Sequence, residues 1–448
     1  MTRFRSVLVW SACALLAAGF ATAVFAEQAK LDVSVSHPLL LEEGKQTVYV
    51  KVGLTGFELK EQADRTPVNL SVVLDRSGSM GGSKIEQAKE AAIFALDRLG
   101  KNDILSIVVY DDRIDVLLPA TKLTDKEAVR KLIRQIDARG STALYGGVQK
   151  GAEELRKFLD KNRVNRIVLL SDGLANVGPD TPAALEELGK GLAGENISVS
   201  TMGLGLGYNE DLMLRLAKSG EGNHYFIENS GDLAGFFDCE FESAMMVVAQ
   251  DADFKVRFGD GIRPVRALNR QVDIEGQSAT FSIPQIYADH EKYVIFEVEV
   301  KPHSGAKEQQ VASAEVSYTN IVTKTTDRLN SSASVRFTGS SEMVESKINK
   351  KVLEEAVLLI ANLQNEMATR LRDEGDIKGA EKLLKKNAAY INESRDRYAL
   401  PAARLDSAAD MNLRQSERLS EDEWAANRKS MSAAQGGFGG QQYTPSQK

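Results

Sequence analysis

The sequence predicts an α/β domain with a mostly parallel six-stranded sheet, inserted into a β-sandwich and followed by a helical hairpin. Between residues 67 and 246, apolar runs of strand length alternate with segments of helical period. Residues 31–57 and 250–338 instead alternate apolar and polar side chains, as half-buried strands do. The helical period returns between residues 348 and 394. A chain of 448 residues is too long for one ordinary core, so several domains are expected.

The N-terminal 26 residues are typical of a secretory signal. A basic start precedes an apolar run, Val7 to Phe25, which is followed by Ala26 and the charged Glu27. We expect cleavage after residue 26, and an uncleaved anchor helix is the alternative because the run is nearly long enough to span a bilayer. Cleavage would remove Cys13 and leave Cys239 as the single cysteine, which we interpret as a small buried apolar residue. An exported protein of this length without disulfides fits a bacterial periplasm or cell surface.

Six strands are expected in the central region, at residues 68–74, 104–110, 114–118, 166–170, 197–203 and 224–227. Only three residues separate the second and third strands, so these should form an antiparallel hairpin, with Asp111 and Asp112 in a solvated turn. The other strands need helical crossovers and should therefore be parallel. A first helix carries Ile85, Ala88 and Leu96 on one face. Further helices are expected near residues 125–137, 143–158, 181–193, 210–219 and 231–245.

The flanking regions predict the rest of the architecture. Strands within residues 27–66 cannot close a sheet alone, so they should join the strands of residues 247–340 in one discontinuous sandwich. Residues 341–396 predict a helical hairpin packed on that sandwich, with a partner-binding helix as the alternative. Residues 397–448 include a glycine-rich stretch and are expected to form a flexible tail.

Oxygen-bearing side chains follow two of the expected strands, and another precedes an expected helix. Asp75, Ser77 and Ser79 alternate directly after the first strand, and Asp172 follows the fourth. Thr142 precedes the helix expected at residues 143–158. Open α/β sheets bind ligands at the carboxyl ends of their strands, where these side chains should meet. Such oxygens suit a hard cation such as Mg²⁺, Ca²⁺ or Mn²⁺.

This set of residues resembles the metal-ion-dependent adhesion site of a von Willebrand factor A domain, a Rossmann-like fold, and the resemblance covers residues 67–246. The resemblance implies that Ser77 and Ser79 coordinate the metal directly, joined by Thr142 in the ligand-engaged state. It further implies that Asp75 and Asp172 act directly or through water. The expected cofactor is one divalent cation, Mg²⁺ before Ca²⁺ or Mn²⁺.

A single metal is expected because Met80 and two glycines follow Ser79, instead of the neighbouring acids that build a second site in integrin β chains. Three neutral hydroxyl ligands would leave the cation with an open position. The expected partner is a protein that fills this position with a Glu or Asp carboxylate. More loosely, the layout of the flanking regions resembles bacterial relatives of inter-alpha-trypsin inhibitor heavy chains and calcium-activated chloride channel regulators.

Other kinds of chemistry find little support. The net charge of −7 argues against nucleic acid as a partner. The glycines of residues 203–207 do not match the dinucleotide fingerprint, and the four histidines are scattered without a zinc-protease motif. A metal-dependent hydrolase would need a general base near the five site residues, and no candidate is apparent.

We therefore expect an exported, non-enzymatic binding protein of the adhesion type. The alternative is a regulatory subunit of a membrane channel or transporter. Membrane association is expected only through an uncleaved N-terminal segment or through a partner.

Overall fold

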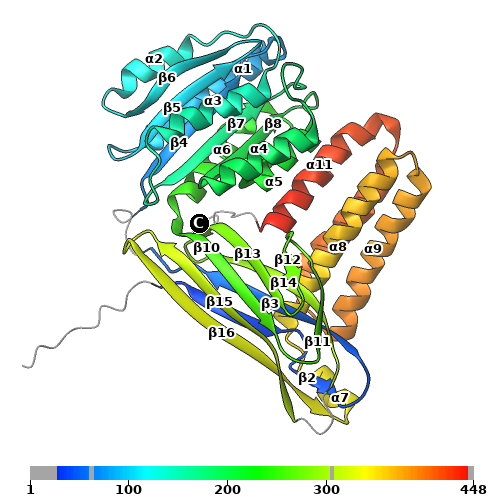
Figure 1. Ribbon diagram of the computed structural model, residues 1–448. Coiled ribbons are helices and arrows are strands. Elements are labelled where there is room, and N and C mark those ends of the chain that lie inside the picture. Colours follow the sequence, from blue (N-terminus) through cyan, green and yellow to red (C-terminus); the bar gives the residue numbers. More distant parts are fainter. Residues whose placement is uncertain (1–27, 60–64, 303–306, 442–448) are drawn as a thin grey trace, which may run out of the picture.

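The structure is a computed structural model that describes residues 28–59, 65–302 and 307–441. It has three parts: an α/β domain, a two-sheet sandwich beneath it, and a group of long helices alongside both (Figure 1). The expected signal segment, residues 1–26, lies outside the described residues. Within the described ranges, no helix combines the length and apolar character needed to cross a membrane.

The central domain contains the predicted six-stranded sheet, in the order β6-β5-β4-β7-β8-β9. Its strands are β4 (Val68–Asp75), β5 (Ile104–Tyr110), β6 (Ile114–Lys122), β7 (Val164–Ser171), β8 (Ile197–Leu204) and β9 (Glu221–Ile227). Only the β5–β6 pair is antiparallel, as the short turn between them predicts. The predicted fold class is therefore confirmed for this domain.

Helices cover both faces of this sheet (Figure 1). They are α1 (Ser83–Arg98), α2 (Lys126–Arg134), α3 (Leu144–Arg156), α4 (Pro182–Gly194), α5 (Glu210–Ser219) and α6 (Leu233–Met245). One core contains residues of α1, α2 and α6 together with Val72 and Leu74 of β4. The opposite core contains Val73 and residues of α3, α4 and α5. Because successive strand residues point to opposite faces and both faces are covered, the central strands β4, β5 and β7 are buried throughout and largely apolar.

Two antiparallel sheets form the sandwich, in the orders β1-β3-β14-β11 and β12-β13-β10-β15-β16-β2. The strands are β1 (Lys30–Val35), β2 (Leu39–Leu41), β3 (Gln46–Thr55), β10 (Val247–Phe258), β11 (Ile262–Ala267), β12 (Asp273–Glu275), β13 (Ser278–Tyr287), β14 (Glu291–Val300), β15 (Glu308–Asn320) and β16 (Thr325–Thr338). The single parallel pairing among them joins β2 to β16. The N-terminal strands thus belong to both sheets, and the α/β domain is an insertion between β3 and β10.

The chain enters and leaves the inserted domain at neighbouring points. Thr66, just before β4, donates a hydrogen bond from its hydroxyl to the carbonyl oxygen of Val247 at 2.7 Å. Val247 is the first residue of β10 and follows α6 closely. The two connections to the sandwich therefore lie side by side.

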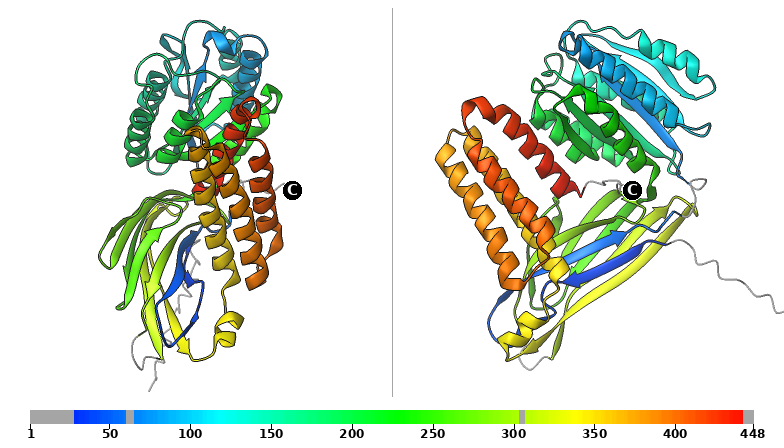
Figure 2. Two further views of the ribbon diagram at one scale, coloured as in Figure 1. Left: turned by 90° about the vertical axis from the view of Figure 1, so that its right-hand side faces the viewer. Right: turned by 180° about the vertical axis from the view of Figure 1, so that it is seen from behind.

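The C-terminal region contains more helix than the sequence predicts. The short α7 (Ser341–Ser346) is followed by α8 (Lys350–Asp373) and α9 (Ile377–Tyr398), which form the predicted hairpin. Two further helices, α10 (Ala402–Glu417) and α11 (Glu421–Gly440), occupy the region expected to be a flexible tail. That expectation is wrong for residues 397–441. Helix α11 lies between the hairpin and the α/β domain, against α8, α5 and the edge strand β9 (Figure 2).

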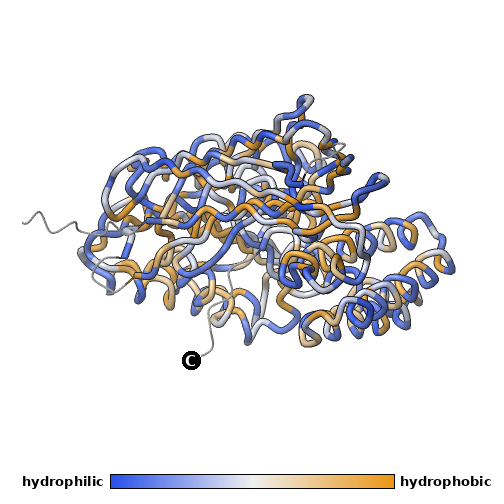
Figure 3. Tube along the Cα trace, turned by 90° about the horizontal axis from the view of Figure 1, so that it is seen from below, coloured by the Kyte–Doolittle hydropathy of each residue, from blue (hydrophilic) through white to orange (hydrophobic). Residues whose placement is uncertain are grey.

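The sequence did not predict α11 because this helix buries few apolar side chains. Its buried residues are Asn427, Lys429, Met431, Ser432 and Gln435, so its hydrophobic pattern does not mark it as a packed helix. One of its glycines allows close packing: a Cβ atom on Gly436 would lie 2.7 Å from Leu214 Cδ1 of α5. Figure 3 shows hydrophilic and hydrophobic residues mixed along the helices.

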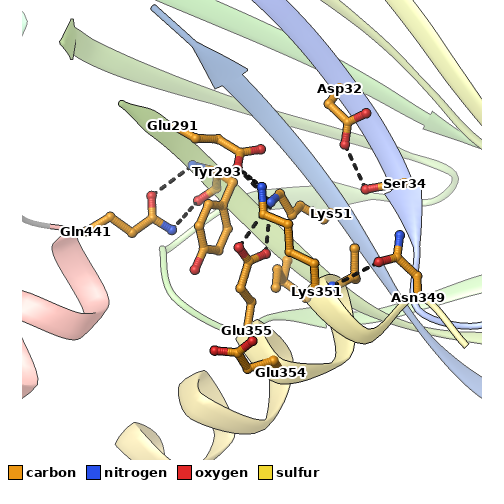
Figure 4. A network of polar contacts seen from close by, with 12 residues as sticks. Asp32, Ser34, Lys51, Glu291, Tyr293, Asn349, Lys351, Glu354, Glu355 and Gln441 are labelled. Atoms are coloured by element: carbon orange, nitrogen blue, oxygen red, sulfur yellow. Dashed lines mark hydrogen bonds and ion pairs between the residues drawn. The ribbon is translucent and has the colours of Figure 1, made fainter. Parts of the chain in front are cut away.

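A buried ion-pair network attaches α8 to the sandwich (Figure 4). Lys51 of β3 is 1% exposed, and its ammonium lies 2.9 Å from Glu355 of α8 and 2.8 Å from Glu291 of β14. Lys351 of α8 approaches the same Glu291 oxygen at 3.0 Å. Because an unpaired buried charge is costly, these contacts fix the orientation of α8 on the sheet.

Candidate metal-binding site

The five predicted site residues lie together at the carboxyl edge of the central sheet. Asp75 is the last residue of β4, and Asp172 follows the last residue of β7. A short 3₁₀ turn, residues 78–80, includes Ser79. The Ser77 and Ser79 hydroxyl oxygens are 3.0 Å apart, and Ser79 donates to Asp172 Oδ1 at 2.7 Å. The backbone N–H of Ser77 donates to Asp75 Oδ1 at 2.7 Å.

The fifth residue, Thr142, faces the same space. A Cβ atom built on Gly173 would lie 3.1 Å from the Thr142 hydroxyl oxygen, 3.3 Å from that of Ser79 and 3.7 Å from that of Ser77. Three hydroxyl oxygens from two loops therefore surround one small space that the absence of a side chain at residue 173 leaves free. The donor set consists of oxygen atoms alone, as Mg²⁺, Ca²⁺ and Mn²⁺ prefer, so these residues fit a divalent cation.

The electrostatics of the site also fit a cation. Asp75 is fully buried, and this burial raises the pKa of its carboxyl to about 6. Hydrogen bonds from Ser171 and Ser77 oppose the rise, and the charge of Asp172 adds to it. A positive charge beside two buried carboxyls would favour their ionised forms.

Lys84, which the sequence reasoning missed, supplies one such charge. It is the second residue of α1, and its ammonium forms an ion pair with Asp172 Oδ2 while lying 3.5 Å from the carbonyl oxygen of Ser79. The side chain is 33% exposed. A lysine at the first turn of the helix after Ser79 was the available signal, but only the fold shows that it reaches Asp172.

Asp111 was also misinterpreted. Instead of lying in a solvated turn it is 1% exposed, and it accepts hydrogen bonds from Arg76 Nε at 2.8 Å and Arg139 Nε at 2.9 Å. Burial alone would raise its pKa, but the bonds and charges of these arginines outweigh burial and lower it. Because the arginines belong to the two loops that carry Ser77 and Thr142, Asp111 holds those loops together.

The geometry defines an open α/β domain with an oxygen-rich site at the carboxyl edge of its sheet. Among the described residues there is no cluster of three or more His, Cys, Asp and Glu side chains suited to a metal. The candidate site is not such a cluster, because three of its five donors are hydroxyl groups. Residues 69–238 match the sequence model of the von Willebrand factor type A domain. This part of the chain is a von Willebrand factor A domain, as its motifs predicted.

Known proteins support this assignment. An uncharacterised protein of Synechocystis is 35% identical over 168 residues, or 38% of this chain and 39% of that protein. Inter-alpha-trypsin inhibitor heavy chain H3 of Pongo abelii is 29% identical over 185 residues, or 38% of this chain and 21% of that protein. A likeness to these heavy chains is thus shown over 38% of this chain, and the chain covers no more than 39% of the length of either relative. The expected likeness of the flanking regions stays a prediction.

One solved structure shares the fold of nearly the whole chain. It is a von Willebrand factor type A protein from Catenulispora acidiphila, with a TM-score of 0.68 at 16% identity, covering 89% of this chain and 91% of that one. Domains of this family commonly bind a divalent cation, mediate protein–protein interactions and are typically non-enzymatic. The fold and family thus indicate an interaction module.

Proposed function

We propose that this chain is an exported, non-enzymatic protein that engages a partner protein through one divalent cation. Asp75, Ser77, Ser79, Thr142 and Asp172 would hold the cation, with Mg²⁺ the first candidate. The observation that carries the proposal is the convergence of three hydroxyl oxygens beside two buried carboxyls at the carboxyl edge of the sheet.

The donor set explains why a carboxylate should complete the site. Ser77, Ser79 and Thr142 contribute no negative charge, and Asp172 is already neutralised in part by Lys84. A cation held there supplies a Lewis-acidic position for an acidic side chain from outside. Asp75 is buried and held by Ser171 and Ser77, so it stays in place while the partner binds.

The remainder of the chain would mount and orient the A domain. The contacts that tie the domain to the rest include the two neighbouring connections to the sandwich, the packing of α11 on β9 and α5, and the network around Glu240 of α6. The basic and apolar N-terminal segment supports export. Mass spectrometry of the exported protein should find Glu27 at its N-terminus, whereas an intact segment would indicate an anchor.

Isothermal titration calorimetry tests the cation site. We expect saturable binding of Mg²⁺, Ca²⁺ or Mn²⁺ that is lost in Ser77→Ala and retained in Ser346→Ala, a serine on α7 far along the chain. An acidic peptide should be included in a second titration, because the partner carboxylate completes the coordination. Equal binding by wild type and Ser77→Ala, or no binding with and without the peptide, would contradict the proposal.

A further inference from the structure

Large apolar side chains are exposed on the two loops beside the candidate metal site. Leu174 is 59% exposed and Val177 is 36% exposed, and both lie in the loop that begins at Asp172. The backbone N–H of Val177 donates to the carbonyl oxygen of Thr142 at 3.3 Å, so this loop wraps around a site residue.

Leu206, on the adjoining loop, is 53% exposed. It lies between two glycines that approach the site closely. A Cβ atom on Gly205 would lie 3.9 Å from Lys84 Cε, and one on Gly207 would lie 2.8 Å from the carbonyl oxygen of Asp172. The two loops follow the neighbouring parallel strands β7 and β8, so they leave the sheet side by side.

The charge of this face points to an acidic occupant. Two carboxyls, Asp75 and Asp172, belong to the site, and Lys84 forms an ion pair with one of them. A bound divalent cation would therefore more than balance the remaining negative charge, leaving the face positive at its centre. Exposed leucines are common when scattered singly, but here they border a polar, cation-binding centre.

We propose that the partner presents an Asp or Glu immediately beside a large apolar residue, with the carboxylate on the cation and the apolar side chain on Leu174 and Leu206. This inference rests on the proposed function and adds a specificity to it. An acidic side chain alone would bind the cation equally well in any sequence. Burial of a neighbouring apolar side chain against the two leucines would give some acidic segments a higher affinity than others.

Random short peptides displayed on phage are the probe. They would be selected on the full chain in Mg²⁺ and eluted with chelator. We expect enrichment of Asp or Glu next to Leu, Ile, Phe or Met. Replacing that apolar residue by Ser in a selected peptide should weaken its binding about tenfold or more on wild type. The loss should be much smaller on Leu206→Ser and Leu174→Ser.

Leu159→Ser is the matched control, because Leu159 is 42% exposed beyond the C-terminal end of α3 in the same domain. It should behave as wild type. Thermal unfolding of all variants would verify that they are folded. Chelator-sensitive acidic peptides without apolar preference, or a preference unchanged in both leucine variants, would overturn this inference and leave the proposed function standing. The absence of any chelator-sensitive peptide would overturn both.

An anionic membrane is the competing occupant. Vesicles of phosphatidylcholine with and without phosphatidylserine separate the two in a sedimentation assay. Cation-dependent binding to the anionic vesicles that requires Leu174 and Leu206 would overturn the proposal of a protein partner. We expect no such binding.

Discussion

The ammonium group of Lys429 lies 4.1 Å from the centre of the Tyr208 ring and donates a hydrogen bond to the Tyr208 carbonyl oxygen at 2.6 Å. The same group contacts Glu210 Oε2 at 2.5 Å, and Lys429 is 3% exposed. Arg428 adds contacts to Glu210 and Asp211. Helix α11 thereby holds the β8–α5 loop, so a C-terminal helix fixes one side of the candidate site.

Lys429→Met should destabilise the protein by about 2–4 kcal/mol, because it removes a buried charge whose partner Glu210 then depends on Arg428 alone. Urea denaturation measures the change, and hydrogen exchange should show faster opening of residues 203–210. Lys385→Met is the control: its pair with Glu381 is exposed, so a loss below about 0.5 kcal/mol is expected. Equal losses in both variants would contradict a structural role for the α11 contact.

Stability should fall in acid because of His224. Burial lowers its pKa from 6.5 to about 4, although Glu210 nearby opposes the shift and Lys429 supports it. Its Nδ1 pairs with the Thr201 hydroxyl at 2.8 Å. The unfolded chain then binds more protons between pH 6.5 and 4, so the folded state loses stability as pH drops through this window. The loss attributable to His224 between pH 7 and 5 is about 2 kcal/mol.

Comparison with His224→Asn isolates this effect. The variant keeps a polar group near Thr201 but cannot take up a proton, so its stability should change less between pH 7 and 5 in urea denaturation. Parallel pH dependences for the two proteins would show that His224 is not the titrating group.

Gly173→Ala should abolish cation binding while leaving all five donors in place. The added methyl group would lie 3.1 Å from the Thr142 hydroxyl oxygen and 3.3 Å from that of Ser79, filling the space that they surround. Calorimetric titration with Mn²⁺ measures the loss. Gly191→Ala on α4 is the control, since its methyl group meets nothing within 4 Å and should raise helix stability slightly. Undiminished binding in Gly173→Ala would place the cation elsewhere.

Glu240→Ala should destabilise the chain by about 3–5 kcal/mol. Glu240 accepts hydrogen bonds from Arg166 at 2.6 Å and Asn223 at 2.8 Å, and Arg166 reaches onward to Gln285 of β13. Without the carboxylate, Arg166 would be a buried, uncompensated charge. Chemical denaturation measures the loss, and Glu242→Ala on the same helix should lie within about 1 kcal/mol of wild type. A small effect at Glu240 would argue against the α6 network as a link between the A domain and the sandwich.

The sheet and the five donors were accessible from the sequence because both depend on local patterns. Largely apolar strands that alternate with helical segments predict a parallel sheet. Such a sheet places the ends of β4 and β7 at one edge, which brings Asp75 and Asp172 together. Ser77 and Ser79 are only two residues apart in the sequence, so their hydroxyl groups lie close enough to form a hydrogen bond.

Long-range polar contacts could not be predicted from the sequence. Lys84, Asp111 and Lys429 are charged residues of the kind that normally face water, and only the folded chain supplies their partners. The same holds for α11. Its glycine-rich end predicts a flexible tail, because the surface of α5 against which it packs is far away in the sequence.

The adjacent entry and exit of the A domain, marked by the bond from Thr66 to Val247, have an evolutionary consequence. A domain whose ends meet can be acquired by, or removed from, a host fold without rearranging the host strands. The sandwich is built from strands on both sides of the insertion, so its two sheets do not depend on which domain is inserted at this position. Helix α11 packs on α5 and β9, so removal or exchange of the A domain would also take away the surface that α11 contacts.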